Sequence, residues 1–394
     1  MSDTWRKSSI FLCVGAFLHR DCLSFIFDFI ADFGDALRVN HFKKDILMPL
    51  IKKLSVRLQN HPKRLIYPDG EDLRVIKAAR EFATRKLGVP ILVGDKDAIT
   101  AKAQAAEIRT DGIKIINPAD GDDFEILFKL MSGLPVFRGI DAQSLRNMLL
   151  QPLYFSLMML ATNRCDAMVT GASVSTISSL RPIFQIISRQ KGVSTVSSMM
   201  VLSTGIENLG IDGDLFLSDC GVVADPTADE LCDIAITTAA LAGNITLERP
   251  KIAMLSFVSK TPNPKNPSVL KVRAATALVH DRIVAERLDM EVDGELQVDA
   301  ALRPEVAAQK SIASSVAGHA NVLIFPDLNS GNITSKMLQI TSSDVRCYGQ
   351  ILTGLVKPVG EVSRGATEDD IFGTSVIVGA QAVDRRFLSI GDLL

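Results

Sequence analysis

The chain has no excess of charge of either sign. Its 394 residues include 43 lysines and arginines and 45 aspartates and glutamates, which gives a formal net charge of −2. Proteins that bind nucleic acid through its phosphates usually carry a basic excess, and solvating tails carry an acidic one. We therefore expect no nucleic-acid partner, and any anionic ligand must be held by a few local arginines.

Paired cysteines are also missing. The six cysteines are scattered and form no C-x-x-C pair, which fits neither a zinc site nor a disulfide framework; they are Cys13, Cys22, Cys165, Cys220, Cys232 and Cys347. Small buried thiols in a reducing compartment are the simpler interpretation, and they predict a cytoplasmic protein. The carboxylates of residues 293–299 have no completing ligand at a recognisable spacing, so we predict no metal and no tightly bound cofactor.

No apolar run is long enough to cross a membrane. Residues 10–17 are apolar, but His19, Arg20 and Asp21 follow them, whereas a span needs roughly 20 apolar residues. A secretory signal would also need a small-residue cleavage site, and none is clear. We treat residues 1–45 as an extension of unknown role, with association at a membrane surface as the weaker alternative.

From residue 63 onward, short apolar runs that end in turn residues alternate with longer stretches of helical spacing. This alternation predicts an α/β fold with mostly parallel strands. The expected strands are 65–67, 90–93, 113–116, 166–170, 196–202, 215–218, 252–257, 320–325 and 350–356. The expected helices are 75–87, 121–132, 141–163, 178–188, 227–242, 269–288, 333–340 and 367–382.

Ligands of such folds sit beyond the carboxyl ends of the strands, so the loops after strands carry the candidate sites. Residues 363–370 lie between a strand and an apolar helix, where free N–H groups and the Arg364 guanidinium can hold an anion. Asp370 lies one turn inside the helix and could act as a base. Alternatively, Thr367 and Asp370 form a capping box that needs no catalysis.

Three other loops carry weaker signals. Small and hydroxyl residues at 170–176, among them Ser173, precede Arg181, and they allow close approach of a ligand or form only a flexible loop with a surface arginine. Arg74 follows a tight turn at 67–70, where a surface arginine is the ordinary interpretation. Asn329 lies in the polar segment 325–332, which either binds a ligand or only turns the chain.

Taken in order, these loops resemble the phosphate acetyl/butyryltransferase family. The resemblance spans about residues 63–384 and rests on the sequences YPDGEDLR (67–74), GAS (171–173) with LRP (180–182), DGELQVDAA (293–301), ANVLIFPDLNSGNI (320–333), KP (357–358) and SRG (363–365). The acetyl-transferring branch looks closer than the butyryl branch because of DGELQVDAA and FPDLNSGNI.

The resemblance implies the reaction in which acetyl-CoA and phosphate are in equilibrium with acetyl phosphate and CoA. It also implies two α/β domains similar to isocitrate and isopropylmalate dehydrogenases, an active site in the interdomain cleft, and a homodimer. Residues 46–192 with 350–394 would form one domain, and residues 193–349 the other.

The resemblance assigns roles to the candidate residues. Asp370 would deprotonate the CoA thiol, Arg364 would hold phosphate and stabilise the oxyanion, and Ser363 would position ligands in the same pocket. Arg181 would contact a phosphate of acetyl phosphate or of CoA, and Arg74 would lie near the CoA phosphates. Ser173 and Asn329 complete the expected binding residues.

Three segments depart from the family pattern. The usual Arg-Lys-His-Lys-Gly run is replaced by residues 130–139, where Arg138 is the candidate substitute. Prolines occupy the loop 257–267, and Val174 replaces a common histidine. A non-catalytic acyl-CoA-binding regulatory module and an acyltransferase for a longer chain such as butyryl are therefore the alternatives. A decarboxylating dehydrogenase is disfavoured, because we find no metal-binding aspartate cluster or dinucleotide fingerprint.

Overall fold

The computed structural model describes residues 49–120, 123–341 and 344–383. The expected extension at residues 1–45, with Cys13 and Cys22, lies outside the described residues. Among the described residues, no helix has both the length and the apolar character needed to span a membrane.

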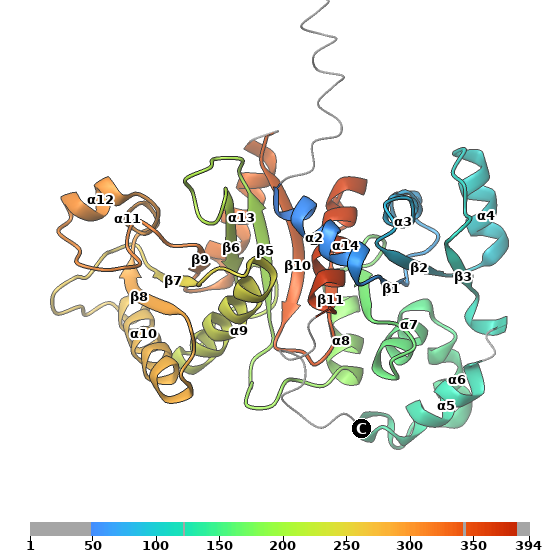
Figure 1. The fold of residues 1–394 in the computed structure, drawn as a ribbon. Coiled ribbons are helices and arrows are strands. Elements are labelled where there is room, and N and C mark those ends of the chain that lie inside the picture. The colour runs from blue at the N-terminus through green and yellow to red at the C-terminus, as the bar shows by residue number, and fades with distance from the viewer. Residues whose placement is uncertain (1–48, 121–122, 342–343, 384–394) are drawn as a thin grey trace, which may run out of the picture. The chain divides into compact units, whose positions relative to one another are not determined.

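The strands form one sheet in the order β3-β2-β1-β4-β11-β10-β5-β6-β9-β7-β8 (Figure 1). One parallel group consists of β1 (Lys63–Tyr67), β2 (Gly88–Val93), β3 (Lys114–Ile116), β4 (Ala167–Thr170) and β11 (Val359–Glu361). A second parallel group consists of β6 (Asp214–Ser218), β7 (Lys251–Leu255), β8 (Glu291–Leu296) and β9 (Val322–Ile324). The expected α/β fold with a mostly parallel sheet is confirmed.

Two central strands join the parallel groups by antiparallel pairing. They are β5 (Ser197–Ser203) and β10 (Arg346–Thr353). Because β10 runs opposite to β11, β5 opposite to β10 and β6 opposite to β5, the two parallel groups point in opposite directions. Loops that follow strands of the first group therefore lie at the opposite sheet edge from loops that follow strands of the second group, which the sequence pattern did not reveal.

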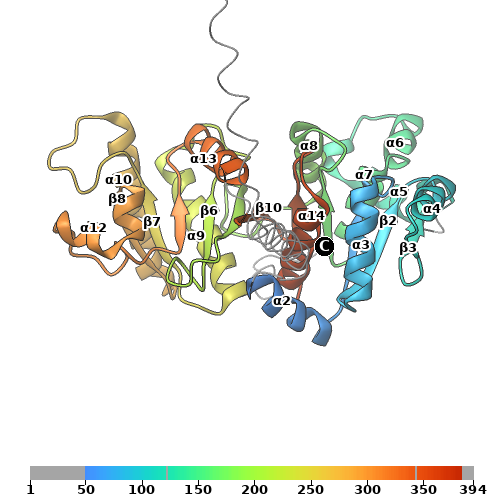
Figure 2. The same ribbon diagram turned by 90° about the horizontal axis from the view of Figure 1, so that it is seen from above.

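Helices cover both faces of the first group. On one face lie α2 (Pro49–Asn60), α3 (Leu73–Thr84) and α14 (Glu368–Gln381), and both α2 and α3 pack against α14. The other face holds α5 (Phe124–Gly133), α6 (Ala142–Leu149), α7 (Pro152–Ala161) and α8 (Thr176–Ile186). In Figure 2, α3 and α14 lie below α6 and α8 in the view. A Cβ on Gly360 of β11 would lie 2.8 Å from the side chain of Thr374 of α14, so α14 packs directly on β11.

The second group carries its own helices. α9 (Ala228–Thr246) packs against α10 (Pro267–Glu286), β6 and β9. Shorter helices follow the remaining strands: α11 (Val298–Leu302), α12 (Pro304–Gln309) and α13 (Leu328–Thr341). In the first group, α4 (Lys96–Ala105) connects β2 to β3.

Three expected elements differ from the structure. The single helix expected at 141–163 is two helices, because Pro152 disfavours helical geometry at Gln151 and starts α7 itself. The carboxylates of 293–299 begin inside strand β8, where Glu295 pairs with Arg273 at 2.7 Å. Asn329 lies in the first turn of α13 and not in a loop.

Candidate active site

Three loops meet at the carboxyl edge of the first group. They follow the neighbouring strands β1, β4 and β11 and comprise residues 68–72, 171–175 and 362–367. Because these strands are parallel and adjacent, their carboxyl ends bring the loops together, as expected for ligand sites in such sheets.

The side chain of Arg74 ties the loops to one another. Its Nε and one terminal nitrogen donate to the two carboxylate oxygens of Asp72, at 3.0 and 2.7 Å. Its other N–H groups donate to the carbonyl oxygens of Ala172 (2.9 Å), Arg364 (2.8 Å) and Ala366 (2.8 Å). A guanidinium has five N–H donors, so protein acceptors use all of them.

This arrangement bears on the role expected for Arg74. A contact with the CoA phosphates stays a prediction, but it would have to share donors that already hold the loops. Burial alone would raise the pKa of Asp72, but the hydrogen bonds and charge of Arg74 lower it overall. The pair therefore stays ionised at neutral pH and holds the three loops in position relative to one another.

The Ser363–Ala366 turn offers a second arginine. The turn is closed by the N–H of Ala366, which donates to the carbonyl oxygen of Ser363 at 2.9 Å. Arg364 is exposed, and its guanidinium has no partner among residues 49–120, 123–341 and 344–383. In contrast to Arg74, Arg364 therefore has its full donor fork available for an anion.

Asp370 forms the capping box that the sequence left open. The Thr367 N–H donates to its Oδ2 at 2.9 Å, and its own N–H donates to the Thr367 hydroxyl at 3.2 Å. Capping occupies one carboxylate oxygen and leaves the other without a protein partner in the described part of the chain. Burial raises the pKa of Cys347 to about 11, and the Asp370 charge adds to this rise, which places Asp370 near the start of β10.

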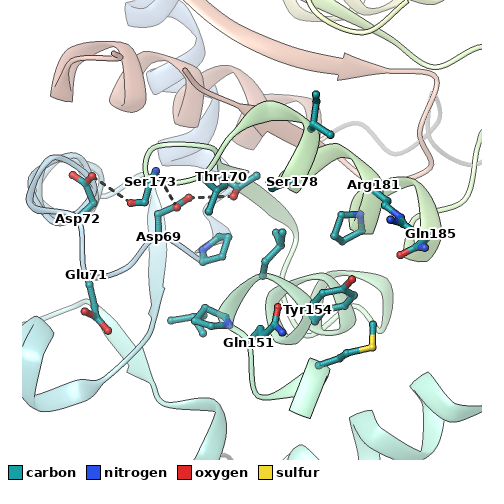
Figure 3. Close-up of a pocket in the computed structure, with 18 of the residues that line it drawn as sticks. Asp69, Glu71, Asp72, Gln151, Tyr154, Thr170, Ser173, Ser178, Arg181 and Gln185 are labelled. Atoms are coloured by element: carbon teal, nitrogen blue, oxygen red, sulfur yellow. Dashed lines mark hydrogen bonds between the residues drawn. The ribbon is translucent and has the colours of Figure 1, made fainter. Parts of the chain in front are cut away.

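A pocket of about 1010 Å³ opens beside the loops. Ser173 and Thr170 lie at one end, next to Asp69 and Asp72, while Arg181 and Gln185 of α8 lie at the other, as Figure 3 shows. No protein partner binds Arg181 among the described residues. Much of the remaining wall is apolar, and it includes Val136, Phe137, Ile140, Leu153, Tyr154 and Ile177.

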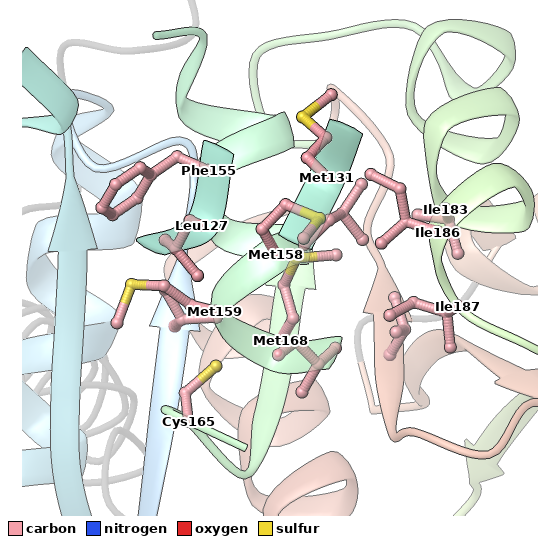
Figure 4. Close-up of a cluster of buried hydrophobic side chains, with 14 of the residues drawn as sticks. Leu127, Met131, Phe155, Met158, Met159, Cys165, Met168, Ile183, Ile186 and Ile187 are labelled. Carbon is pink, nitrogen blue, oxygen red and sulfur yellow. The ribbon is translucent and has the colours of Figure 1, made fainter. Parts of the chain in front are cut away.

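A methionine-rich core lies behind this wall. Met158 and Met159 of α7 pack with Ile183 and Ile186 of α8 and with Met168 of β4 (Figure 4). Because Ile183 and Ile186 anchor the inner face of α8, the opposite side of the same helix presents Arg181 to the pocket. Flexible methionines fill irregular spaces between helix and sheet.

The chain matches known proteins over most of its length. Residues 49–379 match the model of the phosphate acetyl/butaryl transferase family. The chain belongs to this family. It is 36% identical over 335 residues to a phosphate acetyltransferase of Acetivibrio thermocellus, covering 85% of this chain and 98% of the relative, and 37% identical to that of Clostridium acetobutylicum, covering 85% and 99%. Membership confirms the resemblance drawn from the motifs.

A solved structure agrees with these relatives. A phosphotransacetylase from Streptococcus pyogenes superposes with a TM-score of 0.75 at 34% identity, covering 85% of this chain and 98% of that one. An EutD phosphotransacetylase from Staphylococcus aureus gives a TM-score of 0.75 at 32% identity, covering 84% and 98%. The fold described above is therefore that of the phosphotransacetylases.

The structure brings most, but not all, of the expected family residues together. Arg74 links the loops that hold Ser363, Arg364 and Ser173, and Ser173 shares the pocket with Arg181. Asp370 follows the same turn at the start of α14.

Two expected residues are not among these contacts and do not line the pocket. Arg138 is exposed after the turn Pro135–Phe137; Val136 and Phe137 line the pocket, but Arg138 itself does not. Asn329 is exposed and follows β9, whose carboxyl end points in the opposite direction to that of β11. For both residues, a role in binding stays a prediction.

The sequence interpretation missed two acidic residues at the site. Asp69 belongs to the quoted turn 67–70, but only the structure shows that it binds the 170–173 loop. Glu361 is buried at the end of the three-residue strand β11. The available signal was a single acidic residue in an otherwise apolar run before Ser363.

Proposed function

We propose that this chain is a phosphate acetyltransferase that transfers an acetyl group reversibly between CoA and inorganic phosphate. The observation that carries the proposal is that two arginines have no protein partner among the described residues: Arg364 on the turn after β11, and Arg181 of α8, which lines the pocket beside the β4 loop. The relatives that bear the name phosphate acetyltransferase support the same activity.

The proposed reaction begins with proton transfer. Asp370 accepts the proton of the CoA thiol through the carboxylate oxygen that capping leaves unused, because the thiolate is the competent nucleophile. The sulfur then forms a bond to the acetyl carbon of acetyl phosphate. The bond from that carbon to the phosphate oxygen breaks, and phosphate leaves with the electron pair.

Arg364 supplies the electrostatic part of this step. Its guanidinium donates to the oxygen that becomes negative as sulfur attacks, and it holds the phosphate that leaves. Ser363 positions the ligand on the same turn. No covalent acyl-enzyme is required, since holding both substrates in line provides the approximation.

The pocket is the proposed binding site for the larger substrate. Arg181 contacts a phosphate of acetyl phosphate or of CoA, Ser173 lies opposite, and the apolar wall takes the uncharged parts of CoA. Arg74, Asn329 and Arg138 are the further candidates for contact with substrate. CoA and acetyl-CoA act as substrates and not as bound cofactors.

The oligomeric state, the cellular location and the domain boundaries are also proposals. We infer a homodimer, a cytoplasmic location, and two domains comprising 46–192 with 350–394 and 193–349, which share a cleft as in isocitrate and isopropylmalate dehydrogenases. These inferences rest on the family resemblance and, for location, on the spacing of the cysteines.

The deciding experiment is an assay of the purified protein for CoA-dependent loss of acetyl, propionyl and butyryl phosphate. We expect the highest kcat/KM with acetyl phosphate. A preference for butyryl phosphate would instead indicate the longer-chain acyltransferase. CoA binding by calorimetry without any turnover would indicate the regulatory module.

A further inference from the structure

The Gly171 turn is held between two carboxylates from different strands. Gly171 follows β4 directly with a φ of +102°, and a Cβ there would lie 2.2 Å from the carbonyl oxygen of Val362. The same Cβ would lie 2.9 Å from Oε1 of Glu361 on β11. Only glycine fits so close an approach at this conformation. The turn at Gly171 therefore packs directly against the end of β11.

Asp69, in the loop after β1, holds the turn from the other side of β4. Its carboxylate accepts from the Thr170 hydroxyl (3.1 Å), the Gly171 N–H (3.0 Å) and the Ser173 N–H (3.2 Å). Burial raises the pKa of Asp69, while these hydrogen bonds act in the opposite direction. One side of the turn is thus fixed through its main chain.

Glu361 holds the other side through α8. Only 3% of its surface is exposed, and Oε1 lies 3.4 Å from the Ser179 hydroxyl, which shares its hydrogen between Glu361 and the Thr176 carbonyl oxygen at 3.0 Å. Val359, two residues earlier on β11, lies in the core cluster with Ile183 and Ile186 of α8, so Glu361 points toward the same helix. Its carboxylate therefore lies against the first turn of α8, where the helix dipole favours a negative charge.

The groups that face Glu361 set its ionisation. Burial raises its pKa to about 7, hydroxyl groups of Thr176 and Ser179 and the charge of Lys336 on α13 oppose the rise, and the charge of Asp69 adds to it. Neutral and ionised forms are thus both populated near neutral pH. The ionised form accepts hydrogen bonds from the start of α8 more strongly.

Arg181 lies two residues beyond Ser179, on the part of α8 that faces the pocket. We propose that Glu361 is a positioning residue that fixes the first turn of α8 against β11 and so places Arg181 for its ligand. The inference rests on the proposed function, because it assigns Arg181 to the substrate. Glu361 itself does not line the pocket and acts through Arg181.

The test compares Glu361→Gln with wild type at pH 6 and pH 8. The KM for CoA and for acetyl phosphate is measured at both pH values, and the ratio of variant to wild type cancels ionisation of the substrates. For the substrate whose KM Arg181→Ala raises, we expect a ratio near one at pH 6 and about ten at pH 8, with kcat little changed. Glu81→Gln on α3, the same substitution away from the site, should give a ratio near one throughout.

A double-mutant cycle then tests the route through Arg181. We expect Glu361→Gln to have no further effect at pH 8 in the Arg181→Ala background. Ratios of one at both pH values, or effects of the two substitutions that add fully, would overturn the inference.

Two further measurements keep the test decisive. If circular dichroism shows that Glu361→Gln is unfolded, Ser179→Ala removes the hydroxyl that links Glu361 to α8 while leaving the carboxylate in place, and we expect a rise in KM of about threefold at pH 8 and none at pH 6. No rise at pH 8 would then overturn the inference.

If wild type turns over no acyl phosphate, the proposed function fails. CoA affinities of the same variants by calorimetry then take the place of KM, with the same expected ratios.

Discussion

Two carboxylates that follow strands of the sheet accept hydrogen bonds from the N–H groups of a turn, but their surroundings differ. Asp219, after β6, is 3% exposed and accepts from the N–H groups of Ser198, Gly221, Val222 and Val223 and from the Ser198 hydroxyl. Asp69, after β1, is half-buried, accepts from two N–H groups and one hydroxyl, and borders the pocket.

The difference separates a structural turn from a turn that serves a site. At Asp219 the buried carboxylate is surrounded by donors, so its hydrogen-bonding capacity is used within the protein. At Asp69 the same arrangement is incomplete and open to the pocket. Arg74 and Arg364 repeat the contrast, since protein acceptors use all five N–H groups of Arg74 and none of those of Arg364 among the described residues.

The largest effect is expected on removing the Asp219 carboxylate. Asp219→Ala leaves several buried N–H groups without acceptors and should lower the free energy of unfolding by about 4 kcal/mol, whereas Asp69→Ala should lower it by about 1–2 kcal/mol. Urea unfolding monitored by circular dichroism measures both. Equal losses would show that the two turns do not differ as described.

The next effect concerns the pH dependence of stability. The pKa of Glu361 is raised from 4.5 to about 7, so the folded protein keeps a proton that the unfolded chain releases. The contribution of Glu361 to the free energy of unfolding should therefore fall by roughly 3 kcal/mol as pH rises from about 4.5 to about 7. Subtracting the unfolding curves of Glu361→Gln from those of wild type isolates this contribution from other groups such as Asp214. A flat difference would contradict it.

Arg364 should affect activity far more than stability. Arg364→Ala removes an exposed guanidinium that has no partner within the described part of the chain, so the urea midpoint should stay within experimental error. Loss of a charged donor to the oxyanion should lower kcat about a hundredfold. Turnover within about threefold of wild type would exclude Arg364 as the oxyanion donor.

Arg74 should show the opposite balance with a smaller effect. Arg74→Lys keeps the charge but loses the planar fork that binds Asp72 and the carbonyls of Ala172, Arg364 and Ala366. We expect a loss of about 1–2 kcal/mol in the free energy of unfolding, with a smaller fall in kcat than that of Arg364→Ala. An unchanged urea midpoint with a raised KM for CoA would instead favour the ligand contact.

Local patterns revealed most of the architecture. Alternating apolar runs and helical spacing predicted most of the longer strands and helices, because burial on one face repeats with the period of each element; α2, α4 and β8 were not predicted. Strand β11 was not predicted because it has only three residues, of which one is Gly360 and another is the acidic Glu361. The break between α6 and α7 escaped because apolar spacing continues across Gln151 and Pro152.

The site was foreseen in part for a similar reason. Motifs around Ser363, Arg364 and Arg181 are local in sequence, and each follows a strand, so the rule for carboxyl ends of strands found them. The partners of Arg74 lie at positions 172, 364 and 366, far from it in sequence. No local pattern shows which donors of an arginine are already used.

The sequence by itself determined the α/β class, the family motifs and the candidate residues, since these depend on local periodicity and on residue types at fixed spacing. Only the tertiary structure decided that β5 and β10 reverse the direction of the sheet and so separate Asn329 from Ser363 by edge. It also decided that Arg74 holds the loops while Arg364 is available to a ligand. Strand pairing and long-range hydrogen bonds couple residues hundreds of positions apart, and such couplings leave no trace in local spacing.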